Sequence, residues 1–308
     1  MIYTVTLNPA LDRTIIVEKL VLDDTTRILS ETLYAGGKGI DVSRVIRELG
    51  GQSVALGLVG GYDGLHLEGL LINAGVMTDF TKISAETRTN IILKEKDTKN
   101  QFMISAAGPQ VSPTEIGELY HNVLQSQSMD YLVLSGSLPK GVTPNVYGQL
   151  ILAGTKRGAF VVLDTDGRAL KESINYRPTL IKPNRYELSR LVEKDLFSEK
   201  DILIACGDVH KLGIEYVLVS RGKEGIILST EDYKIKAFAP PVQVDSTVGA
   251  GDSVVAGFVK AHSQGKELED CVQLACAAGT ATAKTPGTEL CHLAEVEEVL
   301  QHIKITRL

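Results

Sequence analysis

The sequence contains no long run of apolar residues. Hydrophobic residues make up 44% of the 308 positions, but no apolar segment approaches the roughly 20 residues that a helix needs to span a bilayer. The chain enters a strand-like segment at residues 2–7 without a basic leader. We therefore expect a cytoplasmic protein with no membrane partner.

An excess of positive charge is also missing. The 32 lysines and arginines are outnumbered by 38 aspartates and glutamates, which gives a net charge of −6 and a pI of about 5.6. Nucleic-acid binders normally have the reverse balance, so we exclude nucleic acid as a partner. An anionic ligand would have to be met by a local cluster of basic residues, and we expect a small substrate.

The cysteines and histidines show no metal-binding spacing. There is no Cys-x-x-Cys pair and no histidine at zinc spacing from a cysteine. The six histidines also lack His-x-x-x-His or His-Glu spacing, so none is predicted to be catalytic. The four cysteines are expected to be reduced thiols in the core: Cys206, Cys271, Cys276 and Cys291.

Common nucleotide-binding motifs are absent. The sequence has no Gly-x-x-x-x-Gly-Lys-Ser/Thr loop, and no Gly-x-Gly-x-x-Gly follows a strand. The His-Arg-Asp and Asp-Phe-Gly elements of protein kinases are missing as well. Binding of a nucleotide would therefore need a different architecture.

From about residue 131 onward, the sequence alternates short apolar runs with helical stretches. This pattern is typical of parallel strands joined by crossover helices, and the runs are 131–134, 160–163, 180–181 and 216–219. Polar turns follow each run. Because the carboxyl ends of parallel strands share one edge, the turns should line a ligand crevice there: 135–137, 164, 182–184 and 220–222.

The first third of the chain has a different pattern. Four segments of alternating polarity predict a small, half-buried sheet: 13–19, 27–34, 89–95 and 101–105. We expect one α/β domain over residues 1–308, with a β lid formed by approximately 12–35 and 87–106. Such a sheet could close over the crevice.

The most informative segment is the glycine-rich turn Gly249-Ala250-Gly251, which opens into an apolar helix with Asp252 in its first turn. The backbone N–H groups and the helix dipole form an anion site there. A carboxylate beside an anion site favours phosphoryl transfer onto a hydroxyl, with Asp252 accepting the proton. Its pKa need not be raised, because a helix N-terminus favours the ionised form. The alternative is an ordinary helix start.

Asn184 and Glu187 follow the strand-like run at 180–181. Their spacing places them one turn apart on one helix face, where they could hold a hydrated Mg²⁺ through water. The alternative is a helix N-cap with an exposed glutamate.

Other candidates lie in the first hundred residues. The turn at 36–39 contains Lys38 and suits a phosphate or sugar hydroxyls, and Asp12 could bind a vicinal diol. Arg27 and Arg88 open two lid strands and could each grip a phosphate. The alternatives are a plain loop, a turn aspartate and surface arginines.

The early turn at 36–39 and the late segment 245–253 together resemble the two signatures of the ribokinase-like (PfkB) carbohydrate kinases. The resemblance covers essentially the whole chain. Further segments agree in order and approximate spacing: 6–9 with Asp12, 135–139, 182–184 with Glu187, and 219–220 with Gly222 and Gly225. Within the family, the chain most resembles bacterial 1-phosphofructokinases, with tagatose-6-phosphate kinases and minor 6-phosphofructokinases close by.

The resemblance implies a central, mostly parallel β-sheet flanked by helices, with a lid that forms a homodimer. It implies ATP and Mg²⁺ as cofactors, with K⁺ as a further candidate. Asp252 would be the base, beside the anion hole of Gly249, Ala250 and Gly251. Nucleotide contacts are expected from Lys182, Asn184, Ser220, Gly222, Gly225 and Thr247. Contacts to the phosphosugar are expected from Asp12, Gly37, Lys38, Asp41, Arg88, Asn90 and Ser137, with Arg27 as a further candidate.

The implied reaction is ATP-dependent phosphorylation of a ketohexose monophosphate. Fructose 1-phosphate, converted to fructose 1,6-bisphosphate, is the first expectation, and tagatose 6-phosphate and fructose 6-phosphate are alternatives. An unphosphorylated sugar would not need the cationic Lys38 and Arg88, and a non-catalytic sensor would not need Asp252. Asp41 departs from the family's usual asparagine and adds repulsion toward an anionic substrate.

Overall fold

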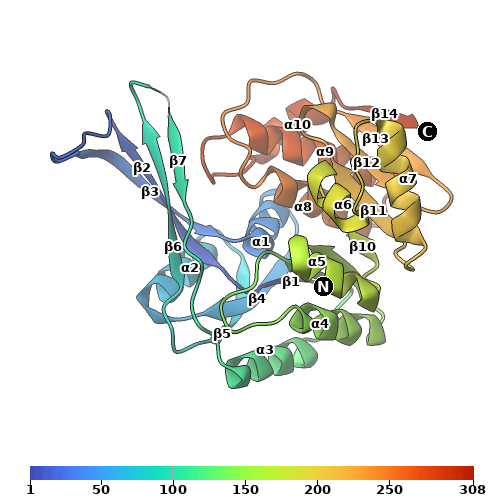
Figure 1. Ribbon diagram of the computed structural model, residues 1–308, viewed down its shortest axis with the longest axis horizontal. Coiled ribbons are helices and arrows are strands. Elements are labelled where there is room, and N and C mark those ends of the chain that lie inside the picture. Colours follow the sequence, from blue (N-terminus) through green and yellow to red (C-terminus); the bar gives the residue numbers. More distant parts are fainter. Residues whose placement is uncertain (99) are drawn as a thin grey trace.

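The computed structural model describes residues 1–98 and 100–308. Most of its strands belong to one 10-stranded sheet with the order β14-β13-β12-β11-β10-β9-β8-β1-β4-β5 (Figure 1). All neighbours from β5 to β11 are parallel, whereas β12, β13 and β14 extend one end in antiparallel fashion. The α/β architecture with a mostly parallel sheet is therefore confirmed.

Four strands of the large sheet, β8 to β11, coincide with the predicted apolar runs. The bounds of all strands in this sheet are β1 Ile2–Thr6, β4 Ser53–Val59, β5 Met77–Lys82, β8 Tyr131–Ser135, β9 Phe160–Asp164, β10 Leu180–Ile181, β11 Tyr216–Ser220, β12 Ile226–Ser229, β13 Lys234–Phe238 and β14 Lys304–Arg307.

Helices cover both faces of this sheet. In β8, Leu132 and Leu134 pack into one core and Val133 into the other, which is why the strand is apolar at successive positions. One core includes residues of α3 Pro113–Gln125, α4 Asn145–Lys156, α5 Gly167–Ser173, α6 Arg185–Val192 and α7 Glu199–His210. The other includes residues of α1 Lys38–Glu48, α8 Ala250–Ser263, α9 Leu268–Lys284 and α10 Leu293–Leu300. A third, smaller core lies under α2 Gly61–Asn73.

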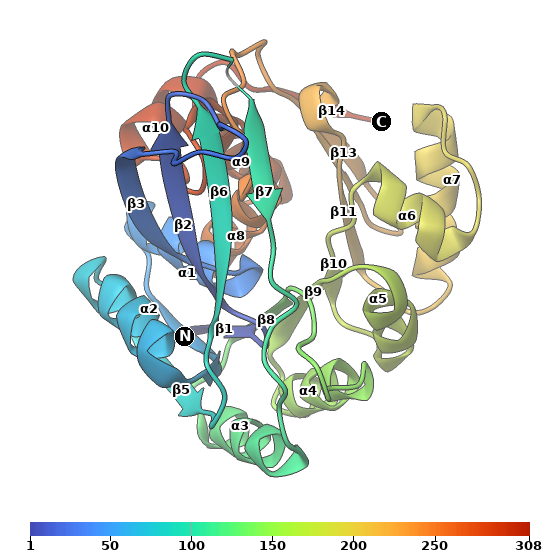
Figure 2. The same ribbon diagram turned by 60° about the vertical axis from the view of Figure 1, so that its left-hand side comes forward.

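A separate four-stranded sheet has the order β3-β2-β6-β7. Its strands are β2 Ala10–Val17, β3 Ile28–Gly36, β6 Arg88–Glu95 and β7 Gln101–Ile104. Figure 1 shows this sheet projecting from the α/β body, and Figure 2 shows its four strands side by side. The structure thus contains the small sheet that the alternating segments predict, with strands over nearly the same residues.

The described residues also settle two smaller points. All four cysteines are free and buried, as expected. Among the helices of this part of the chain, none combines the length and apolar character that crossing a membrane requires.

Candidate active site

Two lysines from different segments share one buried carboxylate. Asp164 ends β9, and its Oδ1 lies 3.0 Å from Nζ of Lys38 and 3.5 Å from Nζ of Lys182. Lys38 begins α1, and Lys182 follows β10. Although burial opposes ionisation, Lys182 and Lys38 hold the pKa of Asp164 below its usual value. The carboxyl ends of the neighbouring strands β9 and β10 therefore meet the start of α1, as the parallel-sheet pattern predicts.

Asp252 belongs to the same cluster. It lies in the first turn of α8 and is 7% exposed. Burial raises the pKa of Asp252 to about 7; Lys38 and Lys182 act against this rise, and Asp164 and Glu187 add to it. The sequence pattern does not call for a raised pKa at Asp252; the rise comes from burial, which the helix start alone does not indicate.

The glycine turn before Asp252 requires its glycines. Gly249 has a φ of 75°, in the left-handed region, and a Cβ there would lie 2.3 Å from Cδ2 of Leu290. A Cβ on Gly251 would lie 3.3 Å from Nζ of Lys182. The turn is therefore held close to the lysine cluster.

Four residues expected to hold the sugar meet where the lid joins the body. The carboxylate of Asp12 accepts a 2.8 Å hydrogen bond from the amide of Asn90, and a Cβ on Gly36 would lie 2.2 Å from Asp12 Oδ2. Burial raises the pKa of Asp12, against the effects of Asn90, Arg88 and Arg44. Nearby, the amide of Asn8 donates to the hydroxyl of Ser137 at 3.1 Å. Gly37 adjoins this group, since a Cβ there would lie 2.9 Å from Thr6 Cγ2.

Arg88 is committed to the protein backbone. Its guanidinium donates to the carbonyl oxygens of Ala106 at 2.7 Å, Asn8 at 2.9 Å and Pro9 at 3.4 Å. These bonds tie the start of β6 to the segment after β7 and to the segment that follows β1. The structure therefore gives Arg88 a fixed place at the site, and a role different from that of an ordinary surface arginine.

Asp41 is buried and paired with Arg44. Arg44 donates to Asp41 Oδ1 at 3.1 Å, and also to the carbonyl oxygens of Ala35, Thr288 and Glu289. Burial raises the pKa of Asp41 well above its usual value; Arg44 opposes the rise, and the nearby Asp252 and Asp12 increase it. The unusual carboxylate thus has its own counter-ion.

The structure does not bring Arg27 to the other sugar residues. Asp12 pairs with Tyr34 near the base of the lid, whereas Val17 at the opposite end pairs with Ile28. Arg27 precedes Ile28 and is exposed. Within one chain, it therefore lies at the far end of the hairpin.

Asn184 and Glu187 form a helix capping box. Asn184 Oδ1 accepts from the backbone N–H groups of Tyr186 and Glu187, and Glu187 Oε2 accepts from the N–H of Asn184. The N-cap alternative is therefore realised, but Glu187 is 9% exposed rather than open to solvent. Its charge acts on both Lys38 and Asp252.

The remaining nucleotide candidates lie beside this cap. Ser220 forms a bridge with Asn184, and the turn η2 Gly222–Glu224 follows directly, closed by Gly225. Thr247 is exposed in the segment before Gly249. Through Ser220 the start of this turn adjoins the cap, and Thr247 belongs to the segment that leads to Gly249.

The sequence pattern places Asp164 among the turns that line the crevice, but it assigns this residue no catalytic or binding role. The available signal is that a carboxylate ends an otherwise apolar strand at the predicted crevice. Its second oxygen, Oδ2, is buried without a hydrogen-bond partner. Buried polar atoms are normally satisfied, so this oxygen points to a ligand or solvent contact.

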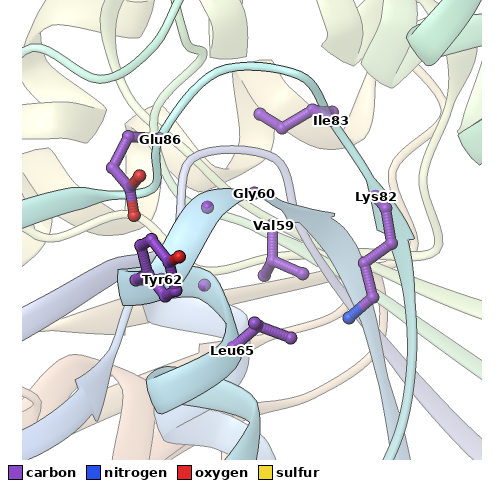
Figure 3. Close-up of a pocket in the computed structure, with 9 residues that line it drawn as sticks. Val59, Gly60, Tyr62, Leu65, Lys82, Ile83 and Glu86 are labelled. Atoms are coloured by element: carbon purple, nitrogen blue, oxygen red, sulfur yellow. The ribbon is translucent and has the colours of Figure 1, made fainter.

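A separate cavity lies at the base of the lid. It has a volume of about 340 Å³ and lies between the start of α2 and the segment that links β5 to β6. Figure 3 shows Tyr62 and Glu86 on one side of it and Lys82 on the other. None of its lining residues belongs to the cluster around Asp252.

Comparisons with known proteins agree with this site. The sequence matches the pfkB family carbohydrate kinases over residues 5–295. It is 35% identical to a 1-phosphofructokinase of Borreliella burgdorferi, with 99% of this chain and 98% of the relative covered. It is 32% identical to a D-tagatose-1-phosphate kinase of Bacillus licheniformis, with both chains fully covered.

Solved structures have the same fold. Phosphofructokinase-2 from Escherichia coli in complex with potassium superposes with a TM-score of 0.93, at 33% identity and with 98% of each chain covered. A tetrameric inhibited form of the same enzyme gives a TM-score of 0.91, at 32% identity and 98% coverage of each chain. The resemblance drawn from the two glycine turns is thereby confirmed, and the chain belongs to the pfkB family of carbohydrate kinases.

Proposed function

We propose that this kinase transfers the γ-phosphoryl group of ATP to a primary hydroxyl of fructose 1-phosphate, yielding fructose 1,6-bisphosphate. The observation that carries the proposal is the cluster at the start of α8. A buried carboxylate with a pKa of about 7 lies there among two lysines at an anion-binding turn.

Asp252 is the proposed base. A carboxyl with a pKa near 7 is partly ionised at neutral pH and can both accept and release a proton there. The transition state of phosphoryl transfer is loose, so the base mainly orients the hydroxyl and takes its proton late. The N–H groups of the turn and Lys38 stabilise the charge on the phosphoryl oxygens.

Mg²⁺ fits the acidic residues of the crevice. Glu187 keeps one carboxylate oxygen outside its capping bond, and Asp164 Oδ2 is unpartnered. Within the described residues, no three side chains of metal-binding type converge, which suits an ion held largely by water and phosphates. When bound, Mg²⁺ would be held with the help of Glu187 and Asp164 and would neutralise negative charge on the ATP phosphates.

K⁺ is a second proposed ion. The support is the Escherichia coli relative, which was crystallised with potassium. In this chain, the Thr288 hydroxyl is buried without a hydrogen-bond partner in a loop that contacts Ser246 through Gly287. A hard oxygen of this type suits an alkali cation. Thermal stability measured in K⁺ and in tetramethylammonium would show whether the cation binds.

The choice of sugar rests on similarity and on charge. Two relatives are named for 1-phosphate sugars, fructose and tagatose, which favours a 1-phosphate over the 6-phosphates. Tagatose 1-phosphate therefore joins tagatose 6-phosphate and fructose 6-phosphate among the alternatives. Because Arg44 is close to Asp41, the added carboxylate does not exclude an anionic substrate.

The test is a substrate panel assayed by ADP release. Fructose 1-phosphate, fructose 6-phosphate, tagatose 1-phosphate, tagatose 6-phosphate, fructose and ribose should be compared by kcat/KM. We expect fructose 1-phosphate to rank first and the neutral sugars last. Preference for fructose or ribose would overturn the phosphosugar assignment, and binding without turnover would indicate a sensor.

A further inference from the structure

A buried arginine lies directly beneath the turn to which we assign the nucleotide. Arg221 follows the last residue of β11 and precedes η2. Its side chain is 3% exposed, whereas Gly222, Lys223 and Glu224 are exposed. A buried charge is costly unless it is paired and hydrogen-bonded, so the contacts of this guanidinium define what it does.

Arg221 folds back onto its own turn. Its Nη2 donates to the carbonyl oxygen of Glu224 at 2.7 Å, and its backbone N–H donates to the carbonyl of Gly225 at 2.9 Å. Nη1 donates to Glu199 Oε2 at 3.1 Å and lies 3.5 Å from the Glu224 carboxylate. The side chain thus holds the far end of the turn at Glu224, and the backbone N–H of Arg221 closes the turn at Gly225.

The anchor for this arginine comes from two other elements. Glu199 lies in the first turn of α7 and also pairs with Lys236 of β13. Its hydrogen bond from Lys236 and the charges of Lys236 and Arg221 hold the pKa of Glu199 below its usual value, against a smaller effect of burial. Figure 2 shows α7 close to β11 and β13 at one end of the large sheet.

The opposite side of the turn rests on β13. Gly225 has a φ of 79°, and a Cβ there would lie 2.0 Å from the carbonyl oxygen of Ala237. The turn is therefore confined between a strand backbone and the Arg221–Glu199 pair. Neither surface leaves it another conformation without losing hydrogen bonds.

We propose that Arg221 is a positioning residue that sets the affinity of this kinase for its nucleotide, by holding the Gly222–Gly225 turn against β13 with Glu199 as its anchor. The inference rests on the proposed function, because that function assigns ATP to this turn. It concerns only the nucleotide side, since the sugar residues lie at the base of the lid.

The decisive variants are Arg221→Met and Arg221→Lys. Methionine removes the charge and all three side-chain bonds. Lysine keeps the charge beside Glu199 but lacks the planar fork that reaches Glu199 and the Glu224 carbonyl together. The control is Arg307→Met, which removes an exposed arginine of β14 that is paired with Glu269.

We expect Arg221→Met to weaken ADP binding about tenfold in calorimetric titration and to raise the KM for ATP similarly. Arg221→Lys should weaken both at least threefold, with an unchanged melting temperature. The KM for the sugar phosphate should stay within twofold in both variants, and Arg307→Met should bind ADP like the wild type. Glu199→Gln should weaken ADP binding in the wild type but add little to Arg221→Met.

Wild-type ADP affinity in Arg221→Lys would overturn the proposal, and this outcome decides even if the methionine variant does not fold. Equal losses for ATP and sugar phosphate would also overturn it, because they indicate general loosening. If the wild-type protein binds ADP but phosphorylates none of the panel sugars, the proposed function fails separately, while the ADP titrations still test Arg221.

Discussion

The ammonium of Lys38 donates a 3.0 Å hydrogen bond to the carboxylate of Asp164, which lies 126 positions further along the sequence. This bond joins the start of α1 to the end of β9. Both groups also act on Asp252, with opposite signs: Lys38 lowers its pKa and Asp164 raises it. The protonation of the proposed base therefore depends on this pair.

Replacing Asp164 and replacing Lys38 should shift the pH profile of kcat/KM in opposite directions. Asp164→Asn removes a negative charge and should lower the pKa of Asp252, so the acidic limb of kcat/KM moves to lower pH. Lys38→Met removes a positive charge and should move it to higher pH, each by about one pH unit. Profiles over pH 5–9 measure both shifts, whatever the loss in maximal rate. A common direction would contradict the pairing.

Asp252→Asn should separate catalysis from stability. Without a base, kcat should fall by at least about 10²–10³-fold while ATP binding remains. Folding raises the pKa of Asp252 from 3.8 to about 7, so its favourable contribution is complete below pH 4 and is lost as the pH rises through 7. The variant should therefore melt at a higher temperature than wild type at pH 8, and the difference should vanish near pH 4.

Near-normal turnover of Asp252→Asn would show that Asp252 is not the base. A stability difference that is the same at pH 4 and pH 8 would show instead that the carboxyl is not titrating in this range.

Gly249→Ala tests the anion-binding turn. The substitution forces a left-handed residue to carry a Cβ 2.3 Å from Leu290, which should cost about 2–3 kcal/mol and lower kcat. Gly265, at the other end of α8, has a φ of 70°, and a Cβ there would have no neighbouring atom within 4 Å. Gly265→Ala should cost only about 1 kcal/mol with unchanged kcat. Urea unfolding and steady-state rates measure both; equal effects would contradict the role of the turn.

Local sequence pattern predicts much of this fold, because a strand buried on both faces appears in the sequence as a continuous apolar run. The continuous apolar runs at 131–134 and 160–163 become β8 and β9, and the half-buried alternation at 13–19 and 89–95 becomes lid strands. Asp252 and Lys38 are found for a similar reason, since glycine turns at helix starts have a local signature.

Long-range contacts leave no such record. Arg44 reaches the carbonyl of Glu289, 245 positions away, and Arg88 spends its donors on backbone carbonyls. The acceptors in these bonds are backbone carbonyl oxygens, so no distinctive side chain marks them in the sequence. The raised pKa of Asp252 likewise follows from tertiary burial, which the helix start alone cannot indicate.

Asp41→Asn tests how the extra carboxylate affects the sugar site. Where Asp41 is ionised, asparagine removes a negative charge near Asp12 and Asp252. Because burial raises the pKa of Asp41, the KM for the sugar phosphate should fall about threefold at pH 9 and less at pH 6. The KM for ATP in the same variant is the internal control and should not change. A rise in the sugar KM would show that Asp41 binds the sugar as an acceptor that asparagine cannot replace.

The lid presents an exposed apolar surface. Its members are between 41% and 91% exposed. They lie near the far end of the β2–β3 hairpin and along β7: Leu20, Val21, Leu22, Ile28, Leu29, Phe102, Met103 and Ile104. Clustered apolar exposure on this scale marks a protein interface. We propose that the occupant is the lid of a second copy, which would cover the same apolar side chains on both lids.

Light scattering of the purified protein should then give the mass of a dimer. The double change Ile28→Glu and Phe102→Glu places charges in this surface and should yield monomers at micromolar concentration, because buried unpaired charge is costly. Tyr62→Glu is the matched control, since Tyr62 is 85% exposed on α2, outside the lid, and it should leave the dimer intact. A wild-type monomer would overturn the proposed dimer, and a dimer that survives the double change would place the contact elsewhere.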